Sequence, residues 1–260
     1  IKKRNCTKYE CLFLDEENGD RRIYLKMANS FFHFKQFTIR QDKCAMKVGT
    51  DGVLLGAWTP VESARRILDV GTGTGLVALM LAQRSPAAIT ALEIDENSAQ
   101  QARENVVRSP WSNRIEVVCT DFRTFVSENK YDSIVSNPPY FMDSLKSPDE
   151  QRNTARHDSR LNYSDLLQGV KRLLSPHGVF TLIIPSVAVA KVMTTAYDYG
   201  LFPFRRLDVI TKPGGTAKRT LIAFSFLEQK CREEVLLTEI SRQQYTNEYI
   251  TLIKDYFLNF

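Results

Sequence analysis

Residues 136–141 read Ser-Asn-Pro-Pro-Tyr-Phe and place two prolines directly after an apolar run. Asn137 offers a side-chain amide oxygen, and Pro138 offers a carbonyl oxygen on backbone that proline keeps stiff. Two fixed acceptors can bind both hydrogens of a planar NH2 group and so direct its nitrogen lone pair toward an electrophile. Tyr140 adds an aromatic face on which a planar base or amide can stack. The sequence therefore predicts amine chemistry with four catalytic residues: Asn137, Pro138, Pro139 and Tyr140.

Three glycines follow a strand-like run in residues 68–75, Leu-Asp-Val-Gly-Thr-Gly-Thr-Gly. Gly71, Gly73 and Gly75 let the backbone turn tightly and approach a ligand, and the helix that follows offers free amide donors. Glu93 ends the next predicted strand, where a carboxylate can accept both hydroxyls of a ribose. Glycine at such a turn often only relieves packing, but packing alone does not explain acidic residues at three successive strand ends: Asp69, Glu93 and Asp121.

The predicted ligand of this loop is S-adenosylmethionine. The spacing GxGxG differs from the GxGxxG of dinucleotide oxidoreductases, and Asp69 would repel a pyrophosphate and attract a cation. S-adenosylmethionine carries a sulfonium and an ammonium but no phosphate, so it suits this charge. We expect Asp121 to hold the adenine amino group with Phe122 against the ring, and we count Ile94, beside Glu93, among the cofactor-binding residues.

Hydrophobic periodicity predicts an α/β fold in which short strands alternate with amphipathic helices. The predicted strands are 67–70, 89–94, 115–119, 131–136, 179–184, 207–210 and 220–226. The predicted helices are 76–84, 96–107, a short one around 122–127, one from an N-cap at Ser164 to about 174, one ending at Gly200, and 246–258. Asn-Pro-Pro is also a common strand-ending turn. At the end of the fourth strand, however, it faces the ligand across the point where the strand order reverses, which favours the catalytic interpretation.

The start of the chain differs in character, so we expect an N-terminal extension with β-hairpin character over 1–42 and one domain over 43–260. Residues 11–26 alternate around Asn18-Gly19 like a hairpin, and residues 31–41 alternate like a further strand. The five cysteines form no cluster with histidine, so neither a metal site nor a disulfide framework is predicted. No apolar stretch approaches the roughly 20 residues that span a bilayer. The scattered thiols fit a reducing cytoplasm.

These motifs, in this order, resemble the class I S-adenosylmethionine-dependent methyltransferases over about residues 43–226. The resemblance implies a Rossmann-like seven-stranded sheet with helices on both faces and a terminal antiparallel pair of strands. It also implies that Gly71, Gly73 and Gly75 flank the methionine part of the cofactor, with Asp69 near the ammonium. In this family, Asn, Asp or Ser followed by Pro-Pro and an aromatic residue marks methylation of planar amino nitrogens in adenine, cytosine, guanine or glutamine.

Residues 44–58, Cys-Ala-Met-Lys-Val-Gly-Thr-Asp-Gly-Val-Leu-Leu-Gly-Ala-Trp, most closely resemble the bacterial methyltransferases that modify adenine 37 at N6 in a valine tRNA. In related enzymes this segment covers the methionine end of the cofactor, which makes four residues candidates there: Lys47, Gly49, Thr50 and Asp51. An adenine in an anticodon loop is unpaired, so extruding it costs less than flipping it from a duplex. The net charge of +5 favours a polyanionic partner such as tRNA.

Basic residues are expected to bind the phosphates that flank the target base. The candidates follow the proline motif or lie on the Gly-rich loop at 211–219: Arg152, Arg156, Lys212, Lys218 and Arg219. On this interpretation, joint loss of Lys218 and Arg219 weakens RNA binding and leaves cofactor affinity unchanged.

Other functions fit part of the pattern. The glutamine amide of a translation release factor is a planar amine that the same motif serves in related proteins, but those proteins usually have a separate helical N-terminal domain, unlike the strand-like start here. A non-catalytic module that binds S-adenosylmethionine or RNA need not keep an intact Asn-Pro-Pro-Tyr. A nicotinamide oxidoreductase is disfavoured by the glycine spacing.

Overall fold

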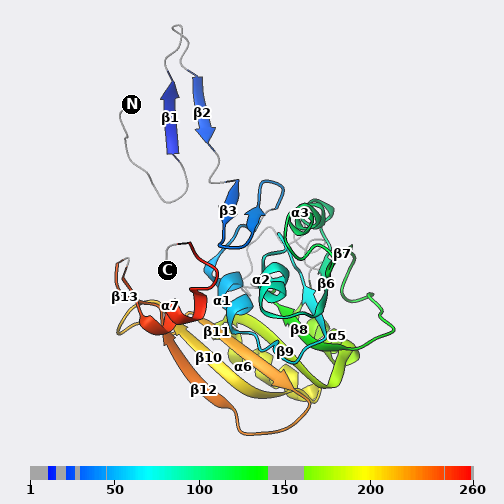
Figure 1. Cartoon of the computed structure of the whole chain (residues 1–260). Helices are drawn as coiled ribbons and strands as arrows, with labels where there is room; N and C mark the ends of the chain where they lie inside the picture. Colours follow the sequence, from blue (N-terminus) through cyan, green and yellow to red (C-terminus); the bar gives the residue numbers. More distant parts are fainter. Residues whose placement is uncertain are drawn as a thin grey trace, which may run out of the picture.

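The computed structural model describes residues 11–15, 22–26, 30–44, 46–139, 161–242 and 244–258. Its centre is an eight-stranded sheet (Figure 1). In sheet order the strands are β12 (Arg232–Leu237), β10 (Phe202–Ile210), β11 (Arg219–Ser225), β9 (Leu174–Pro185), β8 (Tyr131–Ser136), β5 (Arg66–Val70), β6 (Ala88–Glu93) and β7 (Ile115–Cys119).

The five strands from β9 to β7 run parallel, so their carboxyl ends meet at one edge of the sheet. The chain winds outward from β5 to β6 and β7, and then returns to the other side of β5 as β8. This reversal pairs Val70, the last residue of β5, with Ser136, the last residue of β8. The glycine loop and the proline motif therefore begin side by side.

β10 and β11 form the antiparallel tail that the sequence predicts. β11 pairs antiparallel with both β9 and β10, and the Gly-rich loop connects β10 to β11. Arg219 opens β11 opposite Pro185, which ends β9. The root of this loop therefore lies at the same edge of the sheet as the ends of the parallel strands.

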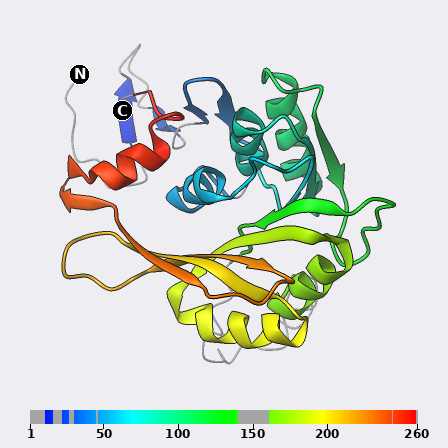
Figure 2. The ribbon, with the colours of Figure 1, turned by 60° about the horizontal axis from the view of Figure 1, so that its bottom comes forward.

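Helices cover both faces of the sheet (Figure 2). Successive strand residues point to opposite faces, so Ile67 packs in one apolar cluster and Leu68 in the other. The first cluster contains residues of α1, α2, α3 and α7, and the second contains residues of α5 and α6. The helices are α1 (Thr50–Trp58), α2 (Leu76–Arg84), α3 (Glu96–Val107), α5 (Tyr163–Leu173), the 3-10 helix η1 (Ser186–Ala188), α6 (Val189–Asp198) and α7 (Asn247–Ile253).

The structure differs from the predicted elements in several places. The last helix, predicted over 246–258, ends at Ile253. The sheet has an eighth strand, β12, which pairs parallel with β10 at the edge of the sheet. The predicted helix around 122–127 is a turn, in which Thr124 N–H and Phe125 N–H donate to the carbonyl of Asp121. The N-cap of α5 is Asn162 rather than Ser164, because the side chain of Asn162 accepts a hydrogen bond from Asp165 N–H.

The N-terminal residues form two hairpins. β1 (Cys11–Asp15) pairs antiparallel with β2 (Arg22–Lys26), as the alternation predicts. The run at 31–41, predicted as one strand, instead forms β3 (Phe31–His33) and β4 (Thr38–Arg40) with a tight turn between them. This second hairpin joins the core, because Phe34, Phe37 and Ile39 are buried in the same cluster as α1 and α7.

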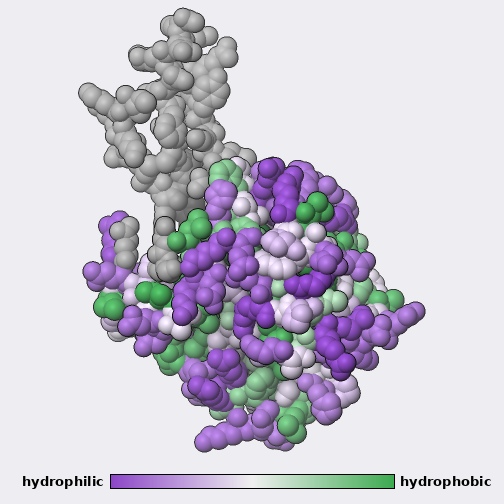
Figure 3. All heavy atoms as spheres, in the orientation of Figure 1, coloured by the Kyte–Doolittle hydropathy of each residue, from purple (hydrophilic) through white to green (hydrophobic). Residues whose placement is uncertain are grey.

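The outer surface is largely polar on the face that Figure 3 shows, where hydrophobic residues lie scattered among hydrophilic ones. In the described ranges, no helix combines the length and the apolar character needed to cross a membrane.

Candidate active site

The glycine loop joins β5 to α2 with three left-handed glycines, whose φ angles are 73° at Gly71, 56° at Gly73 and 83° at Gly75. The loop is fixed to the neighbouring strand because the N–H groups of Gly71 and Thr72 both donate to the carbonyl of Leu92, at 2.9 Å each. A Cβ on Gly71 would meet no atom within 4 Å. The open side of Gly71 is thus available to a ligand.

A cavity of about 230 Å³ lies against this loop. It brings together seven of the residues predicted from the sequence: Lys47, Gly49, Asp51, Asp69, Gly71, Gly73 and Asn137. The other lining residues were not singled out by the sequence analysis: Met46, Gly52, Thr72, Thr74, Leu76 and Val77. The proline motif and the glycine loop therefore share one space, as expected from the pairing of β5 with β8.

Asp69 is the most perturbed acid of the site. Its side chain is 1% exposed, and Thr72 Oγ1 donates to its Oδ2 at 2.6 Å. Burial raises the pKa of Asp69 to about 7, while hydrogen bonds from the Thr72 hydroxyl and the Ala78 backbone oppose that rise. A carboxyl that titrates near neutral pH beside a cavity is suited to bind a cationic group.

Glu93 is held at the end of β6 by backbone donors. Its Oε2 accepts from Gly73 N–H at 2.8 Å, and its Oε1 accepts from Ile94 N–H at 2.9 Å and from Asp95 N–H at 3.0 Å. The carboxylate thus bridges the glycine loop and the start of α3, while the side chain of Ile94 is exposed beside it. Neither residue lines the cavity, so they lie along the loop outside it.

Asp121 and Phe122 follow β7 and lie apart from the cavity. The Arg123 guanidinium holds both carboxylate oxygens of Asp121, and this hydrogen bonding lowers the pKa of that carboxyl. The ring of Phe122 is 4% exposed and packs against α5, where a Cβ on Gly169 would lie 2.3 Å from it. The contact of Phe122 with the adenine ring stays a prediction.

The proline motif follows β8. Asn137 is half-buried and faces the cavity, Pro138 is buried and Pro139 is exposed. The strand end is fixed to β5 because the Ser136 hydroxyl donates to the carbonyl of Val70 at 3.0 Å. Tyr140 lies outside the described residues, as do Arg152 and Arg156.

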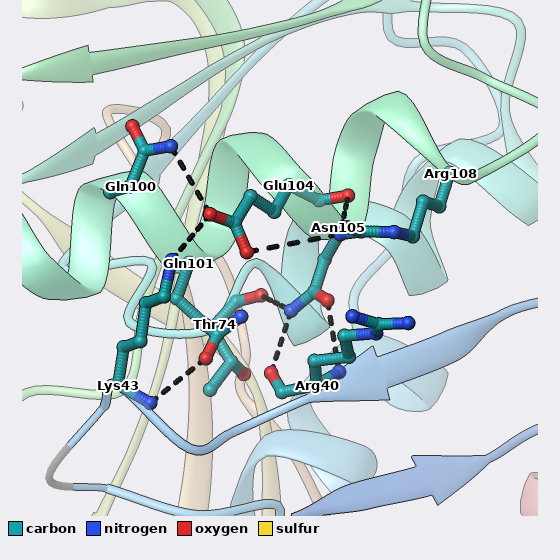
Figure 4. Close-up of polar contacts among 8 residues, drawn as sticks. All are labelled: Arg40, Lys43, Thr74, Gln100, Gln101, Glu104, Asn105 and Arg108. Carbon is teal, nitrogen blue, oxygen red and sulfur yellow. Dashed lines mark hydrogen bonds and ion pairs between the residues drawn. The ribbon is translucent and has the colours of Figure 1, made fainter.

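The segment before α1 is held over the loop by buried side chains of α3 (Figure 4). Asn105, 1% exposed, accepts from Arg40 N–H and donates to the carbonyls of Arg40 and Thr74. Gln101 accepts from Lys43 N–H at 2.9 Å. These contacts join β4, the glycine loop and the chain that leads to Lys47 and Gly49. Thr50 opens α1 and does not line the cavity.

Replacing Asn105 with alanine is expected to lower the free energy of unfolding by about 2 kcal/mol, because the buried carbonyl of Thr74 and the part-buried backbone groups of Arg40 lose their partner. Gln100→Ala on the exposed side of the same helix is the matched control and should change it by less than about 0.5 kcal/mol. Urea unfolding of both variants measures the difference. Equal effects would show that Asn105 does not hold the segment.

Replacing Gly71 with alanine is expected to weaken S-adenosylmethionine binding at least about tenfold, because the new Cβ fills the open side of the loop. Gly200→Ala is the matched control, since Gly200 has φ 72° and also has no atom within 4 Å of a built Cβ. Both variants should lose about 1 kcal/mol of stability from the left-handed backbone. Titration with S-adenosylmethionine separates them, and equal affinities would contradict a cofactor at Gly71.

The predicted RNA-binding residues of the β10–β11 loop divide into two kinds. Lys212 and Lys218 are exposed. Arg219 is half-buried, and its Nε donates to Asp51 Oδ2 at 2.9 Å. Within the ranges that the structure describes, no three His, Cys, Asp or Glu side chains gather into a possible metal site.

Known proteins are similar to this chain in sequence and in fold. A family model described as the methyltransferase small domain matches residues 46–186. Among solved structures, a predicted O-methyltransferase, protein Atu636 from Agrobacterium tumefaciens, superposes with a TM-score of 0.63 at 20% identity over 79% of this chain and 96% of that one. The glycopeptide N-methyltransferase MtfA complexed with S-adenosyl-L-homocysteine has a TM-score of 0.50 at 14% identity over 69% and 92%. These likenesses confirm the predicted methyltransferase fold.

Curated sequence relatives have much higher identity to this chain than these solved structures have. A tRNA1(Val) (adenine(37)-N6)-methyltransferase of Bacteroides fragilis is 63% identical over 235 residues, which cover 89% of this chain and 99% of that protein. The protein of the same name from Bacteroides thetaiotaomicron is 60% identical over 235 residues, 90% of this chain and 99% of that protein. By this similarity and the family-model match, the chain belongs to the tRNA1(Val) (adenine(37)-N6)-methyltransferase family.

Proposed function

We propose that this protein transfers a methyl group from S-adenosylmethionine to the exocyclic N6 amine of adenine 37 in a valine tRNA, the substrate for which its relatives are named. The observation that carries the proposal is that Asn137 and the glycine loop line one cavity. An amine held at Asn137 and a methyl donor held by the loop would face each other across this space.

The cavity suits a cofactor with positive charge and no phosphate. Asp69 supplies a buried carboxylate, Asp51 supplies a second one that is paired with Arg219, and Gly71 leaves room for a ligand against the backbone. When bound, S-adenosylmethionine supplies an electrophilic methyl group on its sulfonium. We assign Lys47, Gly49 and Thr50 to the methionine end, Glu93 to the ribose, and Ile94 and Asp121 to the adenine. Phe122, which is buried, remains predicted beside the adenine.

The proline motif orients and activates the amine. Asn137 and the Pro138 carbonyl accept the two N–H hydrogens, which draws developing positive charge away from the nitrogen during methyl transfer. Pairing between Val70 and Ser136 fixes the distance between this clamp and the glycine loop. Holding the two reactants in line supplies much of the remaining rate enhancement. Tyr140 remains predicted as the stacking platform for the base.

We assign the exposed Lys212 and Lys218 to phosphate binding. The root of their loop at the active-site edge of the sheet supports this assignment. Arg152 and Arg156 remain predicted phosphate contacts. Since the proposed substrate is a tRNA, we infer a cytoplasmic location. We also propose that the extension, drawn as 1–42 from the sequence, ends before β3, because the β3–β4 hairpin belongs to the core.

The proposal is tested by incubating the protein with labelled S-adenosylmethionine and either unmodified total tRNA or a release factor, followed by digestion and identification of the labelled product. Label in N6-methyladenosine is expected. Label found only in release-factor glutamine would show that the substrate is the release factor and not tRNA. Cofactor binding with no transfer to either would favour a non-catalytic binding module.

A further inference from the structure

One ion pair ties the root of the β10–β11 loop to the wall of the cavity. Arg219 Nε donates to Asp51 Oδ2 at 2.9 Å, across 168 positions of the chain. Asp51 lies in the first turn of α1 and lines the cavity with Asp69 and Asn137. The fold allows this contact because β11 begins opposite the end of β9, at the active-site edge.

The same guanidinium also fixes the loop itself. Arg219 Nη1 donates to the carbonyl of Lys218 at 3.0 Å, and that carbonyl also accepts from Ser186 N–H at 3.2 Å. The N–H of Lys218 donates to the carbonyl of Val209 at 3.0 Å. Arg219 therefore joins three parts of the site: the helix that lines the cavity, the root of the basic loop and the end of β9.

Burial distinguishes Arg219 from the lysines of the loop. The Arg219 side chain is 32% exposed and that of Asp51 is 23% exposed, whereas Lys212 and Lys218 are exposed. A guanidinium that already donates to a carboxylate and a carbonyl has fewer donors left for an RNA phosphate. The lysines, with mobile ammonium groups, are better suited to that contact.

We propose that Arg219 is a positioning residue for the cofactor. Through Asp51 it holds the wall of the cavity, and through the Lys218 carbonyl it holds the loop that carries the lysines. Cofactor binding and RNA binding therefore both depend on this one side chain. The inference deepens the proposed function and revises the expectation that loss of Lys218 and Arg219 affects RNA binding alone.

The first test measures the dissociation constant of S-adenosylmethionine by calorimetry, without RNA, for the wild-type protein and three variants. Arg219→Ala is expected to raise the dissociation constant about twofold to fivefold, the range for a partly exposed ion pair. Arg219→Lys keeps the positive charge but loses the planar guanidinium. Its dissociation constant should lie between those of the wild-type protein and Arg219→Ala. Lys218→Ala is the matched control and should leave it unchanged.

A second measurement separates the effect on cofactor binding from the effect on RNA binding. With tRNA as substrate, Lys218→Ala should raise the KM for tRNA only, whereas Arg219→Ala should raise the KM for both substrates. Asp51→Asn combined with Arg219→Ala should weaken cofactor binding no more than the more severe single variant, because the two residues act as one unit.

An unchanged dissociation constant in Arg219→Ala overturns the proposal. So does tighter binding, which is expected if Arg219 acts only by repelling a cationic cofactor. Failure of the wild-type protein to methylate tRNA would contradict the proposed function instead, and the cofactor titrations would still decide the role of Arg219. Thermal melts that match between Arg219→Ala and Lys218→Ala exclude a general loss of folding as the cause.

Discussion

Replacing Asn137 with alanine is expected to lower the rate of methyl transfer to tRNA about 100- to 1,000-fold, the cost of losing one preorganised electrostatic partner of a transition state. The physical reason is that the amine loses one of its two acceptors, so positive charge on the nitrogen develops without compensation. Affinity for S-adenosylmethionine should stay within about twofold, because the glycine loop, Asp69 and Glu93 keep their contacts. Single-turnover rates with saturating cofactor measure this effect.

Asn113→Ala is the matched control for this substitution. Asn113 is exposed just before β7, at the opposite edge of the sheet from the proline motif, so its loss should leave the rate unchanged. A rate loss in Asn137→Ala that is matched by an equal loss of cofactor affinity would place Asn137 in cofactor binding and contradict its role at the amine.

Replacing Asp69 with asparagine is expected to stabilise the ligand-free protein at pH 8, because a buried negative charge is removed. The same change should weaken S-adenosylmethionine binding roughly 10- to 100-fold, because the cofactor loses a charged partner. Burial raises the pKa of Asp69 from 3.8 to about 7, so the folded protein holds this proton more tightly than the unfolded chain. The free energy of unfolding contributed by Asp69 therefore falls as pH rises from about 4 to about 7 and is constant above. The loss is on the order of 4 kcal/mol.

The matched measurement is the melting temperature of both proteins, with and without S-adenosylmethionine, between pH 5 and pH 8.5. The wild-type protein should gain more stabilisation from the cofactor as pH rises through about 7, because the ionised carboxylate is the form that binds a cation. Asp69→Asn should show a smaller gain that does not vary over this range. An identical pH dependence in both proteins would show that another group is responsible.

The parallel half of the fold follows closely from local sequence. α2, α3, β7 and β8 begin and end where the periodicity predicts, because each is a continuous apolar or amphipathic run. β12 escapes such reasoning, since Arg-Glu-Glu-Val-Leu-Leu lacks strict alternation and is a strand only because β10 offers an unpaired edge. The turn at 122–127 depends on hydrogen bonds from Arg172 of α5 to the carbonyls of Phe122 and Arg123.

In the candidate site, too, some features follow from local sequence and others depend on contacts between distant segments. Motif spacing predicts that the glycine loop and Asn137 meet, because parallel strands bring their carboxyl ends to one edge. It does not predict that the Phe122 ring packs against Gly169, a distant residue with no side chain to oppose the ring. It also misses the partner of Arg219 and the role of Asn105, because both contacts join segments far apart in the chain. Pairing between side chains far apart in the chain carries no local sequence signal.

The most direct test of the central claim compares two unmodified valine tRNA transcripts as methyl acceptors, one with adenine 37 and one with guanine at that position. The proposed function predicts transfer to the first, recovered as N6-methyladenosine at position 37, and none to the second. Equal transfer to both transcripts, or to neither, would contradict adenine 37 as the substrate of this site.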